Sequence, residues 1–141
     1  MRKESKTDKV IIDTNIWISF LIGKHLKGLH YIIASDVIKI ITCKEQLAEL
    51  YEVFQKPKIR KYFTTYQIHE FFDLLDDCSL LIEVESNVDI CRDPKDNFLL
   101  ALAKDANAHF IISGDNDLLT LESFALAKII SYKEFEAFFL T

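Results

Sequence analysis

The chain has 141 residues, of which 50% are hydrophobic and 12% aromatic, so wholesale disorder is excluded and one domain with a packed core is expected over residues 1–141. Only three glycines and two prolines occur, which argues against a turn-rich β-sandwich or barrel. The net charge of −5 argues against a protein that binds polyanions over its whole surface, but it leaves room for a local basic strip.

Short β-branched runs alternate with segments of helical periodicity along the chain. In chain order we expect strand 9–13, helices 15–22 and 26–34, strand 37–42, helices 44–55 and 66–76, strand 80–84, helix 96–107, strands 110–113 and 128–131, and a last helix over 132–140. Strands separated by helices imply right-handed βαβ units, so the fold class is α/β, with three layers and a central, mainly parallel sheet of four or five strands.

The first of these helices is apolar on more than one side. Trp17 and Phe20 lie on one stripe, whereas Ile18 and Ile22 point elsewhere. This helix is therefore either buried on two sides within the domain or packed against a second copy of the chain.

The cysteines and the N-terminal residues bear on the compartment. Cys43, Cys78 and Cys91 are odd in number, lie far apart and form no C-x-x-C pair, which is typical of reduced thiols rather than of disulfides or a zinc site. The first residues, MRKESKTDK, lack the form of a signal peptide, and the apolar stretch IWISFLIG is too short to span a bilayer. We expect a soluble, cytoplasmic protein.

Acidic side chains are placed where an α/β protein binds ligands, beyond the carboxyl ends of its strands. Asp13 follows the first strand, Asp115 and Asp117 follow the fourth, Asp96 begins a helix, and Glu49 lies in the middle of another helix. Converging carboxylates raise one another's pKa, and a hard divalent cation such as Mg²⁺ or Mn²⁺ relieves that repulsion. Taken singly, Asp13 is explained equally well as a turn former or helix cap, whereas a cap explains Asp96 better and a solvated helix position explains Glu49 better. Asp115 and Asp117 stand in a segment of ordinary turn composition.

The segments VIIDTN, EL before VFQKPKI, DPKDNFLLALA and FIISGDNDLL together resemble the PIN domain, a metal-dependent ribonuclease fold, over residues 10–132. The branch that they resemble is that of the bacterial VapC-type toxins of toxin–antitoxin pairs. The resemblance implies a catalytic and metal-binding quartet of Asp13, Glu49, Asp96 and Asp115. It also implies a further metal-binding acid at Asp117, with supporting roles for Thr14, which would bond a metal-bound water or a ligating carboxylate, and for Asn15. Whether Asp115 or Asp117 is the main fourth acid stays open.

The same resemblance implies an activity and partners. It implies a sheet of four or five parallel strands and Mg²⁺- or Mn²⁺-dependent endonucleolytic hydrolysis of single-stranded or structured RNA. In-line attack at the scissile phosphate would leave 5′-phosphate and 3′-hydroxyl ends. The family's toxins further imply a homodimer and a cognate antitoxin that blocks the site.

A basic strip supplies a candidate contact for RNA. Its members are Lys56, Lys58, Arg60 and Lys61, with the aromatic Tyr62 and Phe63 directly after them. Such a strip can follow a phosphate backbone and stack bases, but a solvated helix end with core aromatics explains the pattern as well. Arg92, just before Asp93, is a second candidate phosphate contact.

Other functions fit the sequence less well. The four histidines, His25, His30, His69 and His109, form no metal-binding motif. A haloacid-dehalogenase-like phosphatase would need a second aspartate two residues after Asp13, where Asn15 stands. The remaining alternative is a catalytically silent PIN fold that binds RNA or protein. A metal-dependent cleavage assay separates it from the nuclease, as a phosphatase assay does for the dehalogenase-like enzyme.

Overall fold

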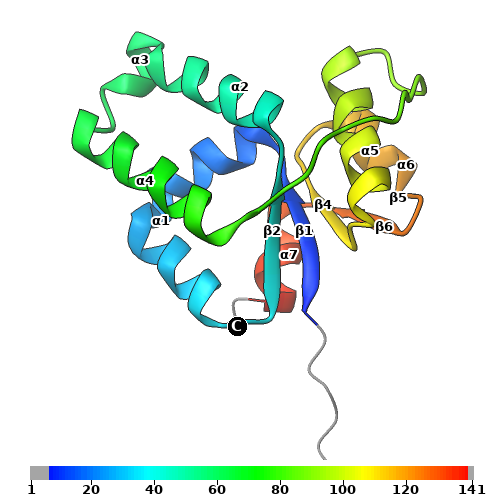
Figure 1. The fold of residues 1–141 in the computed structure, drawn as a ribbon, viewed down its shortest axis with the longest axis horizontal. Coiled ribbons are helices and arrows are strands. Elements are labelled where there is room, and N and C mark those ends of the chain that lie inside the picture. The colour runs from blue at the N-terminus through cyan, green and yellow to red at the C-terminus, as the bar shows by residue number, and fades with distance from the viewer. Residues whose placement is uncertain (1–6, 140–141) are drawn as a thin grey trace, which may run out of the picture.

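A computed structural model of the chain describes residues 7–139, except for the side chains of residues 24–29 and 33. Its centre is one sheet with the strand order β3-β2-β1-β4-β6-β5 (Figure 1). The strands are β1 Asp8–Ile12, β2 Ile38–Thr42, β3 Leu80–Leu81, β4 Phe110–Ile112, β5 Ser123–Phe124 and β6 Ala127–Ile130. All neighbours pair in parallel except β5, which is antiparallel to β6. The expected α/β class with a mainly parallel sheet is thus confirmed, but the sheet has six strands instead of four or five, because the two-residue β5 pairs with its edge.

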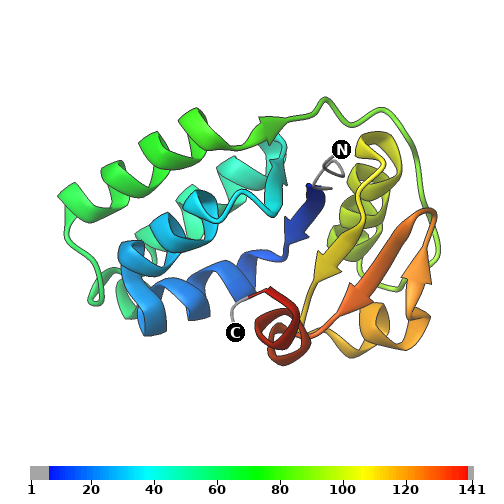
Figure 2. The same cartoon turned by 90° about the horizontal axis from the view of Figure 1, so that it is seen from below.

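Helices cover both faces of the sheet, which makes the expected three layers (Figures 1 and 2). They are α1 Thr14–Ala34, α2 Lys44–Gln55, α3 Pro57–Arg60, α4 Thr65–Cys78, α5 Pro94–Ala106, α6 Asn116–Leu121 and α7 Tyr132–Phe139. None of the helices in the described part of the chain is long and apolar enough to cross a membrane. Cys43, Cys78 and Cys91 are all free thiols, as expected.

The alternation of side chains along each strand divides the core in two. Val10 and Ile12 of β1 belong to the cluster that α1, α2, α4 and α7 cover, whereas Ile11 between them belongs to the cluster under α5 and α6. Because both faces are covered, β1 is apolar at every one of its last three positions. This burial explains why the strand that leads to Asp13 is so rich in β-branched residues.

Helix α1 is continuous where two helical segments were expected. Gly23 lies between them, and the helix continues through it; among the described residues outside its own turn of helix, none lies within 4 Å of where its Cβ would be. Ile18 is 6% exposed and Ile22 packs against the same core cluster as Trp17. Ile18 and Ile22 thus pack within the domain, and packing of this helix on a second copy stays a prediction.

The third strand is shorter than the expected 80–84, since only Leu80 and Leu81 pair with β2. The chain then runs as an extended segment over residues 82–93 along α5, and side chains of that helix bind its backbone. Asp105 accepts hydrogen bonds from the backbone N–H groups of Glu85, at 2.6 Å, and Ser86, at 2.8 Å. Helical side chains thus replace the ladder of a neighbouring strand, which the sequence pattern did not indicate.

The strand order places a topological switch point between β1 and β4. From β1 the chain moves outward to β2 and β3 on one side, and β4, β6 and β5 lie on the other. Ile12 is in register with Ile112, so the residues that follow β1 and β4 emerge side by side at the same edge. This is the position at which open α/β sheets bind their ligands.

Candidate metal centre

Asp13 is held at the end of β1 by the neighbouring strand. Its backbone N–H donates to the Ile112 carbonyl at 2.9 Å, and its carboxylate accepts a hydrogen bond from the Ser113 hydroxyl at 2.8 Å. The same Ser113 oxygen accepts from the backbone N–H of Asp115 at 3.0 Å. One fully buried hydroxyl therefore fixes two of the acids, and this role of Ser113 was missed in the sequence, where it stands out only as the polar end of FIIS.

Asp96 is brought to the same edge by the first turn of α5. Asp93 caps this helix by accepting from the Lys95 backbone N–H at 2.9 Å, and Pro94 occupies its first turn. The side chain of Asp96 is 5% exposed, and its Oδ2 has no hydrogen-bond partner in the described structure. Burial, with the nearby Asp115, Asp93 and Asp13, raises its pKa from 3.8 to about 6.

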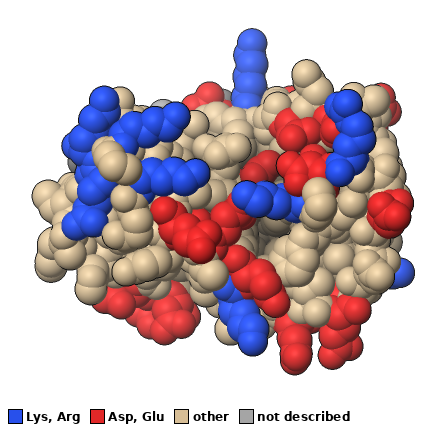
Figure 3. Space-filling model, turned by 90° about the horizontal axis from the view of Figure 1, so that it is seen from above, with Lys and Arg blue, Asp and Glu red and all other residues tan. Residues whose placement is uncertain are grey.

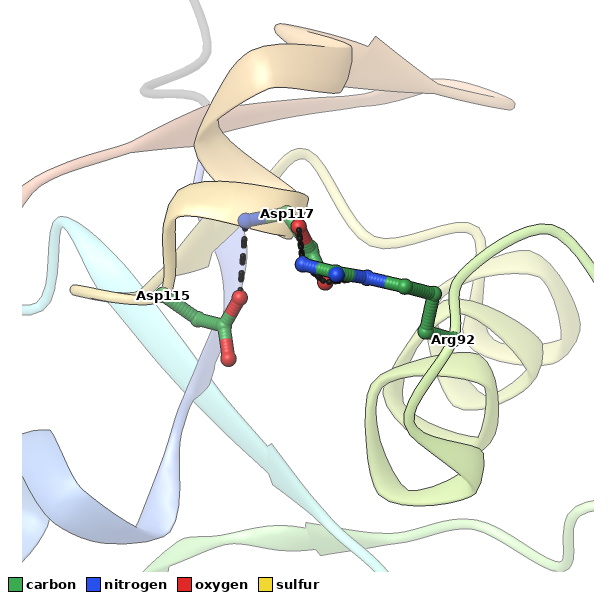
Figure 4. A network of polar contacts seen from close by, with 3 residues as sticks. All are labelled: Arg92, Asp115 and Asp117. Atoms are coloured by element: carbon green, nitrogen blue, oxygen red, sulfur yellow. Dashed lines mark hydrogen bonds and ion pairs between the residues drawn. The ribbon is translucent and has the colours of Figure 1, made fainter.

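The acids after β4 have unequal surroundings (Figure 4). Asp115 caps α6, because its Oδ1 accepts from the Asp117 backbone N–H at 2.8 Å. Asp117 faces Arg92, whose guanidinium bonds both carboxylate oxygens, with Nη2 at 3.0 Å from Oδ1 and Nε at 3.2 Å from Oδ2. One carboxylate oxygen from each of Asp96, Asp115 and Asp117 lies within 4.8 Å of the others.

Glu49 approaches from α2 on the opposite side of the cleft. Its Oε1 accepts from the Thr14 hydroxyl at 2.8 Å, and its Oε2 lies 3.3 Å from the Lys95 ammonium. Thr14 therefore bonds a carboxylate of the predicted quartet, which is one of the two roles expected for it. The contact with Lys95 was not anticipated, because nothing in DPKDN distinguishes a lysine that reaches α2 from a solvated one.

Burial and like charge act together on these side chains. Burial raises the pKa of Asp13 above its ordinary value, against the lowering effect of hydrogen bonds from Ser113 and the Asn15 backbone, and Glu49 and Asp115 raise it further. Asp13, Asp96 and Asp115 thus share one region of negative charge. No ion pair offsets any of these three in the part of the chain that the structure describes.

The acids line one cleft of about 520 Å³, in which acidic side chains surround the hollow centre of the face in Figure 3. Four members of the predicted site line it together with Thr14 and Asn15, while Asp117 lies beside it. The residues of the wall that carry charge are Asp13, Glu49, Lys56, Asp93, Lys95, Asp96 and Asp115. Four acids of the predicted site thus line one cleft, and their catalytic and metal-binding roles stay a prediction.

The donor set fits a hard divalent cation. Every candidate ligand offers carboxylate oxygen, with no thiol or imidazole in the cluster, which is the preference of Mg²⁺ and Mn²⁺. The unpaired, buried Oδ2 of Asp96 is costly unless something neutralises or coordinates it. Asp96, Asp115 and Asp117 each bring one oxygen within 4.8 Å of the others, and Asp13 lines the same cleft, so these are the residues that could hold such an ion.

The basic strip lies at the end of α2 and over α3, beside the acidic cleft, where Lys and Arg side chains gather at one side of the face in Figure 3. Lys56 lines the cleft itself, and Lys58 and Lys61 are exposed. Arg60 is half-buried and bonds Gln55 at 3.3 Å, so it has a structural role.

Of the two aromatic residues of the strip, Phe63 packs on Phe54 in the core, with ring centroids 5.2 Å apart, whereas Tyr62 is 53% exposed. Arg92, the other candidate phosphate contact, is occupied by Asp117. The strip is therefore only partly free to meet a ligand.

An open, mainly parallel sheet with an acidic cleft at its switch point defines an α/β protein with carboxylates gathered where such sheets bind their ligands. The family model of the PIN domain matches residues 9–117, so the chain belongs to the PIN domain family. The uncharacterized protein MJ1680 of Methanocaldococcus jannaschii is 34% identical to it over 117 residues, which cover 80% of this chain and 74% of that protein.

A solved structure also resembles this chain: the crystal structure of VapBC2 from Rickettsia felis bound to a DNA fragment from their promoter. The TM-score is 0.53 at 15% sequence identity, and the alignment covers 87% of this chain and 98% of the other. At this identity the likeness shows the shared fold alone.

Proposed function

We propose that this PIN domain is an endoribonuclease that depends on Mg²⁺ or Mn²⁺ and hydrolyses phosphodiester bonds of RNA. The observation that carries the proposal is the convergence of Asp13, Asp96 and Asp115 at the switch-point edge, with a buried oxygen of Asp96 left unpaired. A divalent cation bound there supplies an activated water and stabilises charge at phosphorus. The charge and geometry of the cleft favour this chemistry over a binding role that needs no metal.

Each residue of the cleft would have its own role in this reaction. Asp13, Asp96 and Asp115 hold the cation, and Ser113 orients the first of them through its 2.8 Å hydrogen bond. Glu49 faces them across the cleft, fixed by Thr14 and paired with Lys95. Lys56 and Lys95 place positive charge on the rim, where they would attract the phosphates of a bound strand.

The biological role that we propose is that of a toxin. Support comes from membership of the PIN domain family and from the shared fold with VapBC2. On this proposal a cognate antitoxin protein covers the cleft, and the chain acts in the cytoplasm as a homodimer. Growth arrest on expression, relieved by Asp13→Asn, is the expected result, whereas arrest that persists in this variant would separate toxicity from the acidic site.

The direct experiment is cleavage of a mixed-sequence single-stranded RNA with Mn²⁺, Mg²⁺ or EDTA. Wild type should cut only with metal, and Asp96→Asn should lose at least about a hundredfold in rate, because it removes a charge that the cation needs. Asp77→Asn, an exposed aspartate of α4, makes the same chemical change away from the cleft and should cut like wild type.

Binding of Mn²⁺ without cleavage of any RNA would favour the catalytically silent PIN fold. Cutting by Asp96→Asn at the wild-type rate would refute the assignment of the site. Cutting by wild type in EDTA would refute its dependence on metal.

A further inference from the structure

Arg92 and Asp117 form a salt bridge at the acidic cluster. Among the described residues of this cluster, theirs is the one pair in which a guanidinium makes several hydrogen bonds to a carboxylate. Arg92 Nη2 lies 3.0 Å from Oδ1 and 3.1 Å from Oδ2, and Nε lies 3.2 Å from Oδ2. Both oxygens of Asp117 are therefore engaged by one cation (Figure 4). Planar, forked pairs of this kind are more specific in geometry than contacts with lysine.

The backbone that carries Arg92 is fixed by the same helix that carries Asp96. Asn97, which is 9% exposed, accepts hydrogen bonds from the backbone N–H groups of Ile90 and Cys91 at 2.9 and 2.7 Å. Its amide nitrogen also donates to the Cys91 carbonyl at 2.9 Å. Arg92 thus follows a stretch of backbone that Asn97 fixes, and its side chain, which is 89% exposed, reaches Asp117 of α6.

The acids of the cluster fall into two groups by their partners. Within the described structure Asp13 and Asp115 accept hydrogen bonds from neutral groups only, and Asp96 keeps an unpaired oxygen, so no cation is paired with any of these three. Both oxygens of Asp117 accept hydrogen bonds from Arg92. One of these oxygens also lies within 4.8 Å of an oxygen of Asp96 and an oxygen of Asp115. Proximity alone would count Asp117 as a ligand, but its partner argues against that role.

We propose that Arg92 is a positioning residue that withholds Asp117 from the cation, so that the ion is held by Asp13, Asp96 and Asp115. This inference rests on the proposed metal site and decides which acid after β4 serves it. The three hydrogen bonds from Arg92 use most of the roughly four acceptor sites of the Asp117 carboxylate, and the charge of Arg92 repels an ion at that end of the cluster. If Arg92 is removed, Asp117 becomes free to join the ligand set.

The test is a double-mutant cycle on Mn²⁺ affinity, measured by calorimetry and by the electron paramagnetic resonance of bound Mn²⁺. The four proteins are wild type, Arg92→Ala, Asp117→Asn and the double variant, each checked for its fold by thermal melting. Asp117→Asn should change the dissociation constant little in the presence of Arg92. Arg92→Ala should tighten binding about fivefold, and the double variant should lose that gain.

A charge-preserving variant separates the fork from simple repulsion. Arg92→Lys keeps the positive charge but lacks the planar fork that fits both oxygens of Asp117. It should give an affinity between those of wild type and Arg92→Ala, together with a changed Mn²⁺ spectrum. Wild-type affinity in Arg92→Lys would show that charge alone is responsible and would overturn the withholding.

The remaining outcomes also decide the question. If Asp117→Asn weakens Mn²⁺ binding by the same factor with and without Arg92, Asp117 is an ordinary ligand or acts by charge alone, and the inference is wrong. In that case the metal site and the proposed nuclease stand. If wild type binds no Mn²⁺ at all, both the proposed metal-dependent function and the inference about Arg92 are wrong.

Discussion

Asp96 is the acid whose burial and lack of partners set it apart at the scale of single residues. It is 5% exposed, its Oδ2 is unpaired, and three other carboxylates face it, so its charged form is disfavoured. A protein keeps such a group at a cost in stability, and the cost indicates a role in binding rather than in folding. Its pKa of about 6 makes this cost measurable.

The metal-free protein should gain stability when this charge is removed. Since the pKa is raised from 3.8 to about 6, the native state still binds a proton between these pH values where the unfolded chain has released it. The contribution of the Asp96 carboxyl group to the free energy of unfolding therefore falls as pH rises from 3.8 to about 6, and it stays low at higher pH. Asp96→Asn should be about as stable as wild type near the lower value and more stable at about pH 7, by up to the roughly 3 kcal/mol that a rise from 3.8 to about 6 is worth.

Urea denaturation in EDTA across that pH range measures the difference between the two proteins. Asp77→Asn, exposed on α4, should follow the wild-type curve at each pH. A gap between Asp96→Asn and wild type that does not grow with pH would contradict the raised pKa. Mn²⁺ should stabilise wild type and leave Asp96→Asn nearly unchanged.

At the scale of elements, helix α5 organises more of the molecule than its length suggests. Its first turn carries Asp96, Asn97 clamps the residues just before Arg92, and Asp105 binds the extended segment two turns further on. One face of α5 packs on the sheet through Leu100 and Ala103. The segment over residues 82–93 is thus positioned by side chains of a helix and not by a strand ladder.

Loss of the Asp105 carboxylate should loosen this segment without touching the cleft. Asp105 accepts from the Glu85 and Ser86 backbone N–H groups and from the Ser86 hydroxyl, and these bonds hold its pKa below the usual range. Asp105→Ala should lower the free energy of unfolding by about 1–2 kcal/mol, because two backbone donors lose their partner. Hydrogen exchange at Glu85 and Ser86 should quicken.

Asp105→Asn is the matched control, since it keeps an acceptor oxygen and should lose less stability than the alanine variant. Exchange at both amides unchanged in Asp105→Ala would show that the segment does not depend on this side chain.

The same element shows what the sequence could predict. Periodicity gave α2, α4 and α5 and the strands of the buried sheet because these elements bury one face or two, and burial leaves a pattern. The predicted strand 80–84 is longer than the observed one. Ile82 and Val84 pack on the core, which gives the sequence a strand-like alternation, but only Leu80 and Leu81 pair with β2. The short α6 begins after its cap at Asp115, and β5 begins after Glu122, which has a positive φ. Local composition alone reveals neither feature.

For the site, the sequence predicts where the acids lie but not the contacts that surround them. Asp13 and Asp115 end parallel strands, so their meeting follows from topology alone. The contacts of Ser113, Lys95 and Arg92 depend on side-chain directions across three elements, and no pattern within one segment contains them.

At the scale of the whole molecule, the surface charge is uneven. The net charge is −5, yet Lys56, Lys58 and Lys61 stand together at the end of α2 and over α3, beside the acidic cleft. A strand that follows these lysines would pass the cleft where Lys56 lines it. The acids alone would repel RNA, so the strip is what would draw a polyanion to this face.

Removal of these three lysines should weaken RNA binding and flatten its dependence on salt. Arg60 stays in place, because it bonds Gln55 and supports the turn after α2. Each phosphate contact with single-stranded RNA contributes about 0.7 to the slope of log K against log salt, so the triple alanine variant should lose up to about 2. Binding is measured with labelled RNA over a series of KCl concentrations, in the Asp96→Asn background so that the strand is not cut.

The matched control replaces three exposed lysines outside the strip, Lys39, Lys44 and Lys128, and changes the net charge by the same amount. If long-range attraction by net charge governs binding, both triple variants should lose equal slope, and the strip is then a solvated face. If the strip follows the backbone of the strand, only its own triple variant loses slope, since counterion release needs phosphates in contact with the lysines. The comparison thus separates a docking track for RNA from the general charge of the protein.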